Sequence, residues 1–306
     1  MAHNSVTDKY KRYLLLEKGL SKNTIEAYLA DLEKLTAFIE AAGLSVQQIT
    51  YNNLETFVAE LHDQKIAPRS VARIISGVKS FFRFLLLDKY IESDPSELLE
   101  VPKIGLKLPV VLSLEEIDAI LCVIDVSTPE GTRNYAIIET LYSCGLRISE
   151  LTNLKFSNLY FSEGFIRVEG KGSKQRLVPI SGTAIQKINN YLSYRKQLKI
   201  QKGQEDIVFL SSRGKAISRI MVFHFIKEYA LAAGIKKEVS PHTFRHSFAT
   251  HLLEHGANIR VIQEMLGHEK ITTTEIYTHI DRDFLRQEII EHHPRNKAGK
   301  SQPDTK

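Results

Sequence analysis

A histidine and an arginine stand where the sequence predicts the start of a helix. The stretch SPHTFRH, residues 240–246, begins with Ser240, a good N-cap residue, and continues with a proline, which is common at the first helical position. His242 and Arg245 are three residues apart, so they share one face of the first turn. Cationic donors beside the free amides of a helix N-terminus favour an anion, and phosphate is the natural candidate. Taken alone, the pair is more simply a surface histidine and a solvated arginine.

A second arginine is predicted just beyond a helix end. GLRISEL, residues 145–151, follows an apolar helical stretch that Gly145 would terminate. Arg147 comes next, and Glu150 stands three residues later, where its carboxylate could orient the guanidinium. Arginine is the side chain whose planar fork matches two phosphate oxygens at once. The alternative is a structural salt bridge.

Three further residues carry reactive groups. Lys171 lies at the predicted tip of a hairpin, and LGHEKITTTEIYTH, residues 266–279, contains His268 and Tyr277. A tyrosine among threonines is usually a packed aromatic or part of a strand. Tyr277 can become a nucleophile only through cationic groups that lie more than a hundred residues away in the chain.

Neither a metal ion nor another cofactor is expected. His242 and His246 have the i,i+4 spacing of zinc ligands, but Thr243 stands where a zinc-protease helix carries glutamate. The chain has only two cysteines, Cys122 and Cys144, which provide neither a metal-ligand cluster nor a disulfide framework. Packing is therefore favoured over metal binding at the histidine pair.

The elements that must position these residues form two predicted domains. Residues 1–94 predict a four-helix unit, because apolar side chains recur at three- and four-residue steps along residues 25–39, 54–61 and 71–85, after a first helix near residues 5–18. Residues 95–112 contain three prolines in a stretch without helical periodicity, which indicates a linker.

The second domain, residues 113–294, is predicted to be mostly helical. Ser113 and Glu116 form a capping-box pattern at its start. The stretch FIRVEGKGSKQRLVPI, residues 165–180, predicts an antiparallel hairpin around a glycine-containing turn. Residues 295–306 are polar and basic and predict a disordered tail. The expected fold class is thus mainly α, with one small β element.

Bulk composition limits the class of protein. A chain of 306 residues with 43% hydrophobic and 25% charged residues fits two globular domains. No apolar run approaches the roughly 18 residues that span a bilayer, and the N-terminus lacks the apolar core of a signal peptide. The expected location is the cytoplasm, without membrane insertion. The net charge of +5 is carried by residues after 100, which favours a polyanionic partner such as nucleic acid.

Taken together, the motifs resemble the tyrosine recombinase (phage integrase-like) family in order and spacing. The resemblance is carried by GLRISEL, VEGKGSKQRLVP, SPHTFRHSFATHLLEHGANIRVIQEMLGH and TTTEIYTHI, and it covers nearly the whole chain. GLSKNTIEAYLADLEKL and RSVARIISGVKSFFRFL are similar to the family's SAM-like, helical core-binding domain. The ending FLRQEIIEHHPRNK resembles the Xer subfamily, and its XerD branch more than XerC.

The resemblance implies a catalytic set and a reaction. The matching positions are Arg147, Lys171, His242, Arg245, His268 and Tyr277. It implies attack of the tyrosine hydroxyl on a DNA phosphodiester, which yields a 3′-phosphotyrosyl link and a free 5′-hydroxyl without metal or ATP. Lys171 is then the expected acid, and either His242 or His268 the base. Cys144 and Phe244 depart from the commoner Thr and Leu, and neither change touches the chemistry.

The resemblance also implies partners. These are double-stranded DNA carrying a specific site, a homologous XerC-like subunit in a tetrameric synapse, and a septal DNA translocase. The helix after Tyr277 is expected to dock into a neighbouring subunit, with packing on its own domain as the alternative. The expected role is resolution of chromosome dimers before cell division. The alternatives are integration of a mobile element and DNA binding without catalysis.

Overall fold

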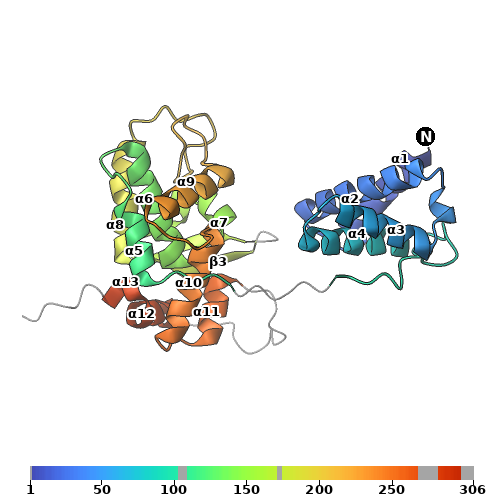
Figure 1. Ribbon diagram of the computed structural model, residues 1–306. Coiled ribbons are helices and arrows are strands. Elements are labelled where there is room, and N and C mark those ends of the chain that lie inside the picture. Colours follow the sequence, from blue (N-terminus) through green and yellow to red (C-terminus); the bar gives the residue numbers. More distant parts are fainter. Residues whose placement is uncertain (1, 103–108, 171–173, 268–281, 298–306) are drawn as a thin grey trace, which may run out of the picture. The chain divides into compact units, whose positions relative to one another are not determined.

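The chain folds into two compact units, residues 1–107 and 108–306 (Figure 1). The computed structural model describes residues 2–102, 109–170, 174–267 and 282–297. The division falls inside the proline-containing segment that separates the two helical patterns in the sequence. Leu99 packs in the core of the first unit and Leu112 in that of the second.

The first unit is a bundle of helices, as its periodicity predicts. Ser21 caps the second helix through a bond from the Thr24 amide to the Ser21 Oγ of 3.3 Å, and Pro68 begins the last helix as expected. Tyr10, Leu35 and Phe82 lie fully buried between the helices. The elements are α1 Ala2–Arg12, η1 Tyr13–Glu17, α2 Lys22–Ala41, η2 Val46–Gln48, α3 Tyr51–Asp63 and α4 Pro68–Leu87.

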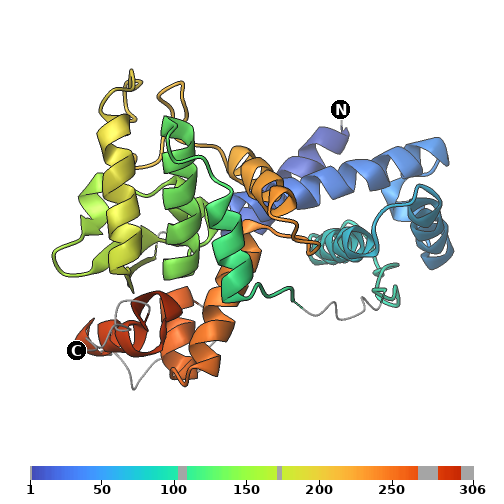
Figure 2. The same ribbon diagram turned by 60° about the vertical axis from the view of Figure 1, so that its left-hand side comes forward.

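The second unit surrounds one central helix, α6. This helix is buried along most of its length, and α8 and α10 pack against it (Figure 2, with α6 in green and α8 in yellow). Ser113 and Glu116 cap α5 at the start of the unit, as the capping-box pattern predicts. The helices are α5 Leu114–Cys122, α6 Pro129–Cys144, α7 Ile148–Thr152, η3 Phe156–Asn158, α8 Gly182–Arg195, α9 Arg219–Ala232, α10 Pro241–Glu254, α11 Ile259–Leu266, α12 Arg282–His292 and α13 Pro294–Lys297.

A three-stranded antiparallel sheet with the order β1-β2-β3 completes the second unit. The strands are β1 Leu159–Tyr160, β2 Phe165–Glu169 and β3 Gln175–Pro179. The predicted hairpin is confirmed, with Glu169 paired to Gln175 next to the turn and Phe165 paired to Pro179 at the open end. The sequence did not predict β1, because a two-residue strand carries no periodicity.

Helix α12 packs on its own unit in this single chain. Leu285 and Ile289 are buried in the core of the second unit, whereas Phe284 and Ile290 on the same apolar stripe remain exposed. The amide of Asn258 also donates to Glu288 on α12, at 3.0 Å. In this chain, α12 therefore packs through one part of the stripe and leaves the other part at the surface.

The predicted tail begins too early. Arg295, which the polar composition assigns to the tail, lies in α13 with a side chain that is only 14% exposed. Its guanidinium pairs with Glu139 of α6 at 3.1 Å and with Asp118 of α5 at 2.6 Å. Composition missed this contact because a buried acid from a distant helix, rather than local pattern, orders the segment.

Replacing Arg295 by alanine should destabilise the second unit strongly. Glu139 is fully buried, and removing one partner of a buried ion pair leaves an uncompensated charge that costs about 3–5 kcal/mol. Urea unfolding at neutral pH measures this loss. The matched control is Lys237→Ala, which breaks the partly exposed pair with Glu116 and should cost about 1 kcal/mol or less. Equal losses for the two variants would contradict the expectation.

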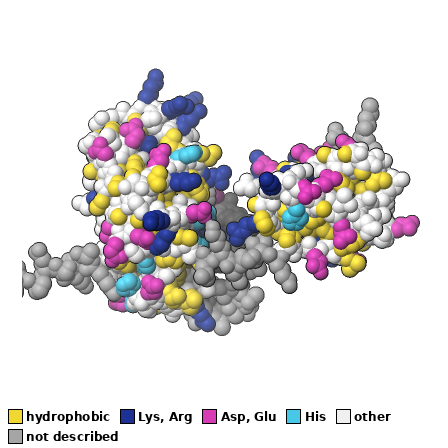
Figure 3. All heavy atoms as spheres, in the orientation of Figure 1, with side chains coloured by type: hydrophobic (Ala, Val, Ile, Leu, Met, Phe, Trp, Pro, Cys, Tyr) yellow, Lys and Arg dark blue, Asp and Glu magenta, His cyan; other side chains and the backbone are white. Residues whose placement is uncertain are grey.

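Surface charge differs between the units. On the face drawn in Figure 3, acidic side chains are frequent on the first unit, while Lys and Arg side chains gather at several places on the second. This distribution agrees with the basic second half of the sequence.

Within the described ranges, no helix combines the length and the apolar character needed to cross a bilayer.

Candidate active site

The first turn of α10 places Arg245 inside the second unit. Ser240 is the N-cap residue and Pro241 opens the helix, as predicted. The backbone amide of Ser240 donates to the Thr243 hydroxyl at 3.0 Å, which closes the turn. Arg245 is only 9% exposed, whereas His242, one turn earlier, is exposed. The same helix turn therefore supplies one buried guanidinium and one accessible imidazole.

The turn from α6 to α7 places Arg147. Gly145 ends α6 with a φ of 57°, in the left-handed region, and a Cβ at this position would lie 2.5 Å from the ring of Phe248. Only glycine allows this close turn. Glu150 then holds Arg147 twice, because it accepts the Arg147 backbone amide at 2.8 Å and its Nη1 at 2.9 Å. The predicted orientation of Arg147 by Glu150 is confirmed.

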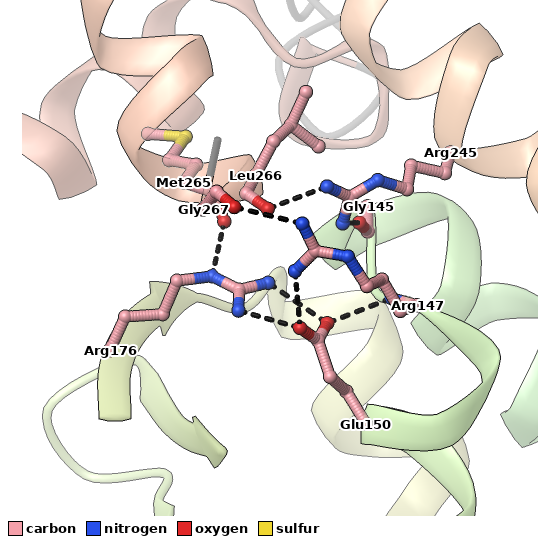
Figure 4. A network of polar contacts seen from close by, with 8 residues as sticks. All are labelled: Gly145, Arg147, Glu150, Arg176, Arg245, Met265, Leu266 and Gly267. Carbon is pink, nitrogen blue, oxygen red and sulfur yellow. Dashed lines mark hydrogen bonds and ion pairs between the residues drawn. The ribbon is translucent and has the colours of Figure 1, made fainter. Parts of the chain in front are cut away.

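The C-terminal end of α11 brings these arginines together. Three successive carbonyls accept hydrogen bonds from three arginine side chains (Figure 4): Met265 from Arg176 at 2.7 Å, Leu266 from Arg245, and Gly267 from Arg147 at 2.8 Å. Arg245 also donates to the carbonyl of Gly145 at 2.7 Å. The partial negative charge at a helix C-terminus stabilises the cations gathered there.

Arg176 is the member of this network that the sequence-based prediction missed. It lies on β3, and its Nη1 and Nη2 donate to the two carboxylate oxygens of Glu150 at 2.7 and 2.9 Å. The available signal was an arginine in the strand directly after the hairpin turn, in GSKQR. A strand arginine of this kind is usually solvated, so local pattern did not single it out.

The network carries more positive than negative charge. Burial alone would raise the pKa of Glu150, but the bonds and charges of Arg176 and Arg147 outweigh it and hold that pKa below its usual value. Burial, followed by the nearby charge of Arg147, lowers the pKa of Arg245 to about 10, so Arg245 stays protonated at neutral pH. The network contains three guanidinium groups and one carboxylate, which leaves an excess of positive charge for an anionic ligand.

His242 remains neutral beside these cations. Partial burial lowers its pKa from the ordinary 6.5, and the positive charges of Arg245, His246 and Arg147 act in the same direction. A neutral imidazole can accept a proton near neutral pH.

The described residues contain half of the predicted catalytic set. Arg147 and Arg245 lie in one hydrogen-bonded network, and His242 is on the first turn of the helix that carries Arg245. Lys171, His268 and Tyr277 lie outside the described residues.

An anion with several oxygens fits the two predicted arginines. A guanidinium has five N–H donors, and the bonds found among the described residues use two on Arg147 and two on Arg245. No described residue engages the other donors, and the Arg147 side chain is 33% exposed. The arrangement can therefore bind a phosphate and stabilise added negative charge on it.

Two family models match the chain. Residues 111–283 match the phage integrase family, and residues 7–89 match the phage integrase N-terminal SAM-like domain. Two solved structures share the fold. A XerH site-specific recombinase has a TM-score of 0.69 and 23% identity, and the match covers 93% of this chain and 84% of that chain. A lambda integrase fragment has a TM-score of 0.67 and 19% identity, and the match covers 91% of this chain and 99% of that chain. The chain belongs to the phage integrase family and is a tyrosine-type site-specific recombinase.

Curated relatives narrow this class. A Tyrosine recombinase XerD of Chlorobaculum tepidum is 42% identical over 291 residues, which cover 94% of this chain and 96% of that protein. A Tyrosine recombinase XerD of Staphylococcus saprophyticus is 40% identical, with coverage of 95% and 99%. Within the family, the resemblance is thus to the Xer subfamily and to XerD proteins in particular.

Proposed function

We propose that this recombinase cuts and rejoins duplex DNA through a 3′-phosphotyrosyl intermediate formed on Tyr277. The observation that carries the proposal is the joint placement of Arg147 and Arg245 on the carbonyls of Gly267 and Leu266, which directly precede His268 in the chain. The tyrosine hydroxyl attacks the scissile phosphorus, and the bond to the 5′-oxygen breaks. Because the new phosphodiester retains the energy of the old one, a 5′-hydroxyl from another strand can reverse the step without ATP.

The proposed roles follow from charge. As the nucleophile adds, negative charge grows on the two non-bridging phosphate oxygens, and Arg147 and Arg245 stabilise it as preorganised donors. Lys171 protonates the departing 5′-oxygen, because an alkoxide is a poor leaving group. His242 accepts the proton of Tyr277, since its lowered pKa keeps it neutral at pH 7, and His268 donates to a phosphate oxygen.

The proposed biological role is resolution of chromosome dimers before cell division. The support is the similarity to proteins named XerD across nearly their full length. The solved relatives include a XerH recombinase bound to its difH substrate and a lambda integrase dimer bound to a core site. By analogy, this chain acts on a specific duplex site together with a XerC-like subunit, within a tetramer that a septal DNA translocase activates.

The rate of DNA cleavage should fall in acid as His242 becomes protonated. A general base must be unprotonated, and the pKa of His242 lies below the ordinary 6.5, so the rate should be flat around neutral pH and fall only below that value. Single-turnover cleavage with duplex below saturation reports the free enzyme. His242→Asn should lower the cleavage rate at neutral pH by about 10²–10⁴-fold and remove the fall of the rate in acid. If the rate of that variant still fell in acid at the same pH, another group would be the base.

The proposed linkage can be tested directly. DNA recovered with the protein from cells and sequenced identifies the site, and a duplex of this sequence with a nick beside the scissile phosphate traps the intermediate. We expect the covalent product to retain label at the 5′ end of the cut strand and to release a strand with a 5′-hydroxyl. Release of a 5′-phosphate would contradict the 3′ linkage.

The position of the recovered site tests the biological role. A site at the replication terminus would support dimer resolution, and a site at the ends of a mobile element would contradict it.

A further inference from the structure

Arg176 directs all three of its side-chain nitrogens at the protein itself. Nη1 and Nη2 bind the two oxygens of Glu150, and Nε donates to the Met265 carbonyl at 2.7 Å. The side chain is only 14% exposed. In Figure 4 its guanidinium lies beside Glu150, on the side opposite Arg245. Three of its five N–H donors are thus engaged with the protein, and its side chain is less exposed than the 33% of Arg147, so Arg176 is less open to a ligand than Arg147.

Arg176 completes the hydrogen bonding of Glu150. The carboxylate accepts four bonds, two from Arg147 and two from Arg176. Planar bidentate pairing fixes both the position and the rotation of a carboxylate. Because Glu150 in turn holds the guanidinium of Arg147, the geometry of Arg147 depends on Arg176 through one intermediate side chain.

The same guanidinium also fixes the end of α11. Its bond to Met265 lies next to the carbonyls that receive Arg245 and Arg147. A Cβ at Gly267 would lie 3.2–3.3 Å from three atoms of Arg176, so the residue before His268 packs tightly on this side chain. Gly170, the residue before Lys171, is also near, because a Cβ there would lie 3.6 Å from the Arg176 Nη1.

We propose that Arg176 is a positioning residue for strand cleavage. It fixes Arg147 through Glu150 and fixes the α11 end that receives Arg147 and Arg245, without contacting the DNA. This inference rests on the proposed function. It predicts that Arg176 affects the rate of the chemical step more than the affinity for DNA, and that a lysine cannot replace it, because an ammonium cannot bind two carboxylate oxygens and the Met265 carbonyl in one plane.

The test compares Arg176→Gln and Arg176→Lys with Arg167→Gln. Arg167 is the matched control, because it lies on the adjacent strand β2 and binds Asn158 rather than Glu150. Single-turnover cleavage of the nicked duplex, duplex affinity and thermal unfolding are measured for each variant. We expect Arg176→Gln to cleave about 100-fold more slowly, as for a displacement of about 1 Å in a reacting geometry, with affinity nearly unchanged. Arg167→Gln should cleave at the unaltered rate.

Arg176→Lys keeps a positive charge beside Glu150, so it carries the test if Arg176→Gln does not fold. We expect it to remain well below the unaltered rate, and full activity in this variant would overturn the inference. Unaltered protein that forms no covalent product would overturn the proposed function and this inference with it. Normal cleavage by both Arg176 variants beside active unaltered protein would overturn the inference alone.

A modified substrate shows through which group Arg176 acts. With sulfur in place of the bridging 5′-oxygen, the leaving thiolate needs little help from an acid, so this duplex should restore cleavage by Lys171→Ala. It should not restore cleavage by Arg176→Gln, because the hydrogen bonds of Arg176 among the described residues lead to Glu150 and α11. Equal restoration in both variants would reassign Arg176 to placement of Lys171 and overturn the inference.

Discussion

Tyr277→Phe is expected to abolish covalent capture of DNA. Loss of the nucleophile should lower the cleavage rate by about six orders of magnitude, as removal of a serine nucleophile does in a protease, because no other group in the proposed mechanism can form the phosphodiester link. Phenylalanine keeps the ring and removes only the hydroxyl, so folding and duplex binding should persist. The measurement is denaturing electrophoresis of the nicked-duplex reaction together with a binding assay.

The matched control for this substitution is Tyr160→Phe. Tyr160 lies on β1 in the same unit, and its ring stacks near Arg167 rather than in the arginine network. Tyr160→Phe should leave covalent capture of DNA unchanged. Covalent product that persists in Tyr277→Phe would place the nucleophile elsewhere, and loss of duplex binding in that variant would mean that the residue serves the fold instead.

Arg245→Lys is expected to cost about two to three decades in cleavage rate, or about 3–4 kcal/mol, the usual effect of losing one preorganised donor to a developing oxyanion. The lysine keeps the charge but cannot bridge the Gly145 and Leu266 carbonyls and also face a phosphate. The loss should therefore appear in the chemical step, and single-turnover rates at saturating duplex measure it.

Arg133→Lys separates this effect from general loss of stability. Arg133 is buried as deeply, and it donates to the Leu210 carbonyl at 3.1 Å and to Asn134, outside the arginine network. Urea unfolding should show similar destabilisation of the two variants, while only Arg245→Lys loses cleavage. Equal cleavage losses would attribute the effect to unfolding and contradict a role for Arg245 at the phosphate.

Local features of the sequence predicted much of the scaffold. The N-cap at Ser240, the helix end at Gly145, the capping box at Ser113 and the hairpin of residues 165–180 all appear in the structure. The caps and the helix end depend on residues within a few positions of one another, and the hairpin joins two strands that are adjacent in the chain, because backbone capping and periodicity are short-range effects. The pairing of Glu150 with Arg147 is also local, because the partners are three positions apart on one helical turn.

The candidate site itself could be gathered from the sequence only by resemblance. Arg147 and Arg245 are about a hundred residues apart, and nothing in either local pattern indicates that both bind the end of α11. The order and spacing of whole motifs supplied that expectation. Arg176 escaped it because its significance depends on Glu150 and Met265, which are distant in the chain and meet it only after folding.

The sequence by itself determined where several helices begin or end, which faces are apolar, and which family the motifs resemble. Only the tertiary structure decided that one helix end binds three arginines, that α12 packs on its own unit, and that Arg295 is buried against Glu139. The physical reason is that an ion pair or a shared carbonyl requires groups from separate elements to meet at hydrogen-bonding distance. Packing of the whole domain establishes that distance, and no short window of residues encodes it.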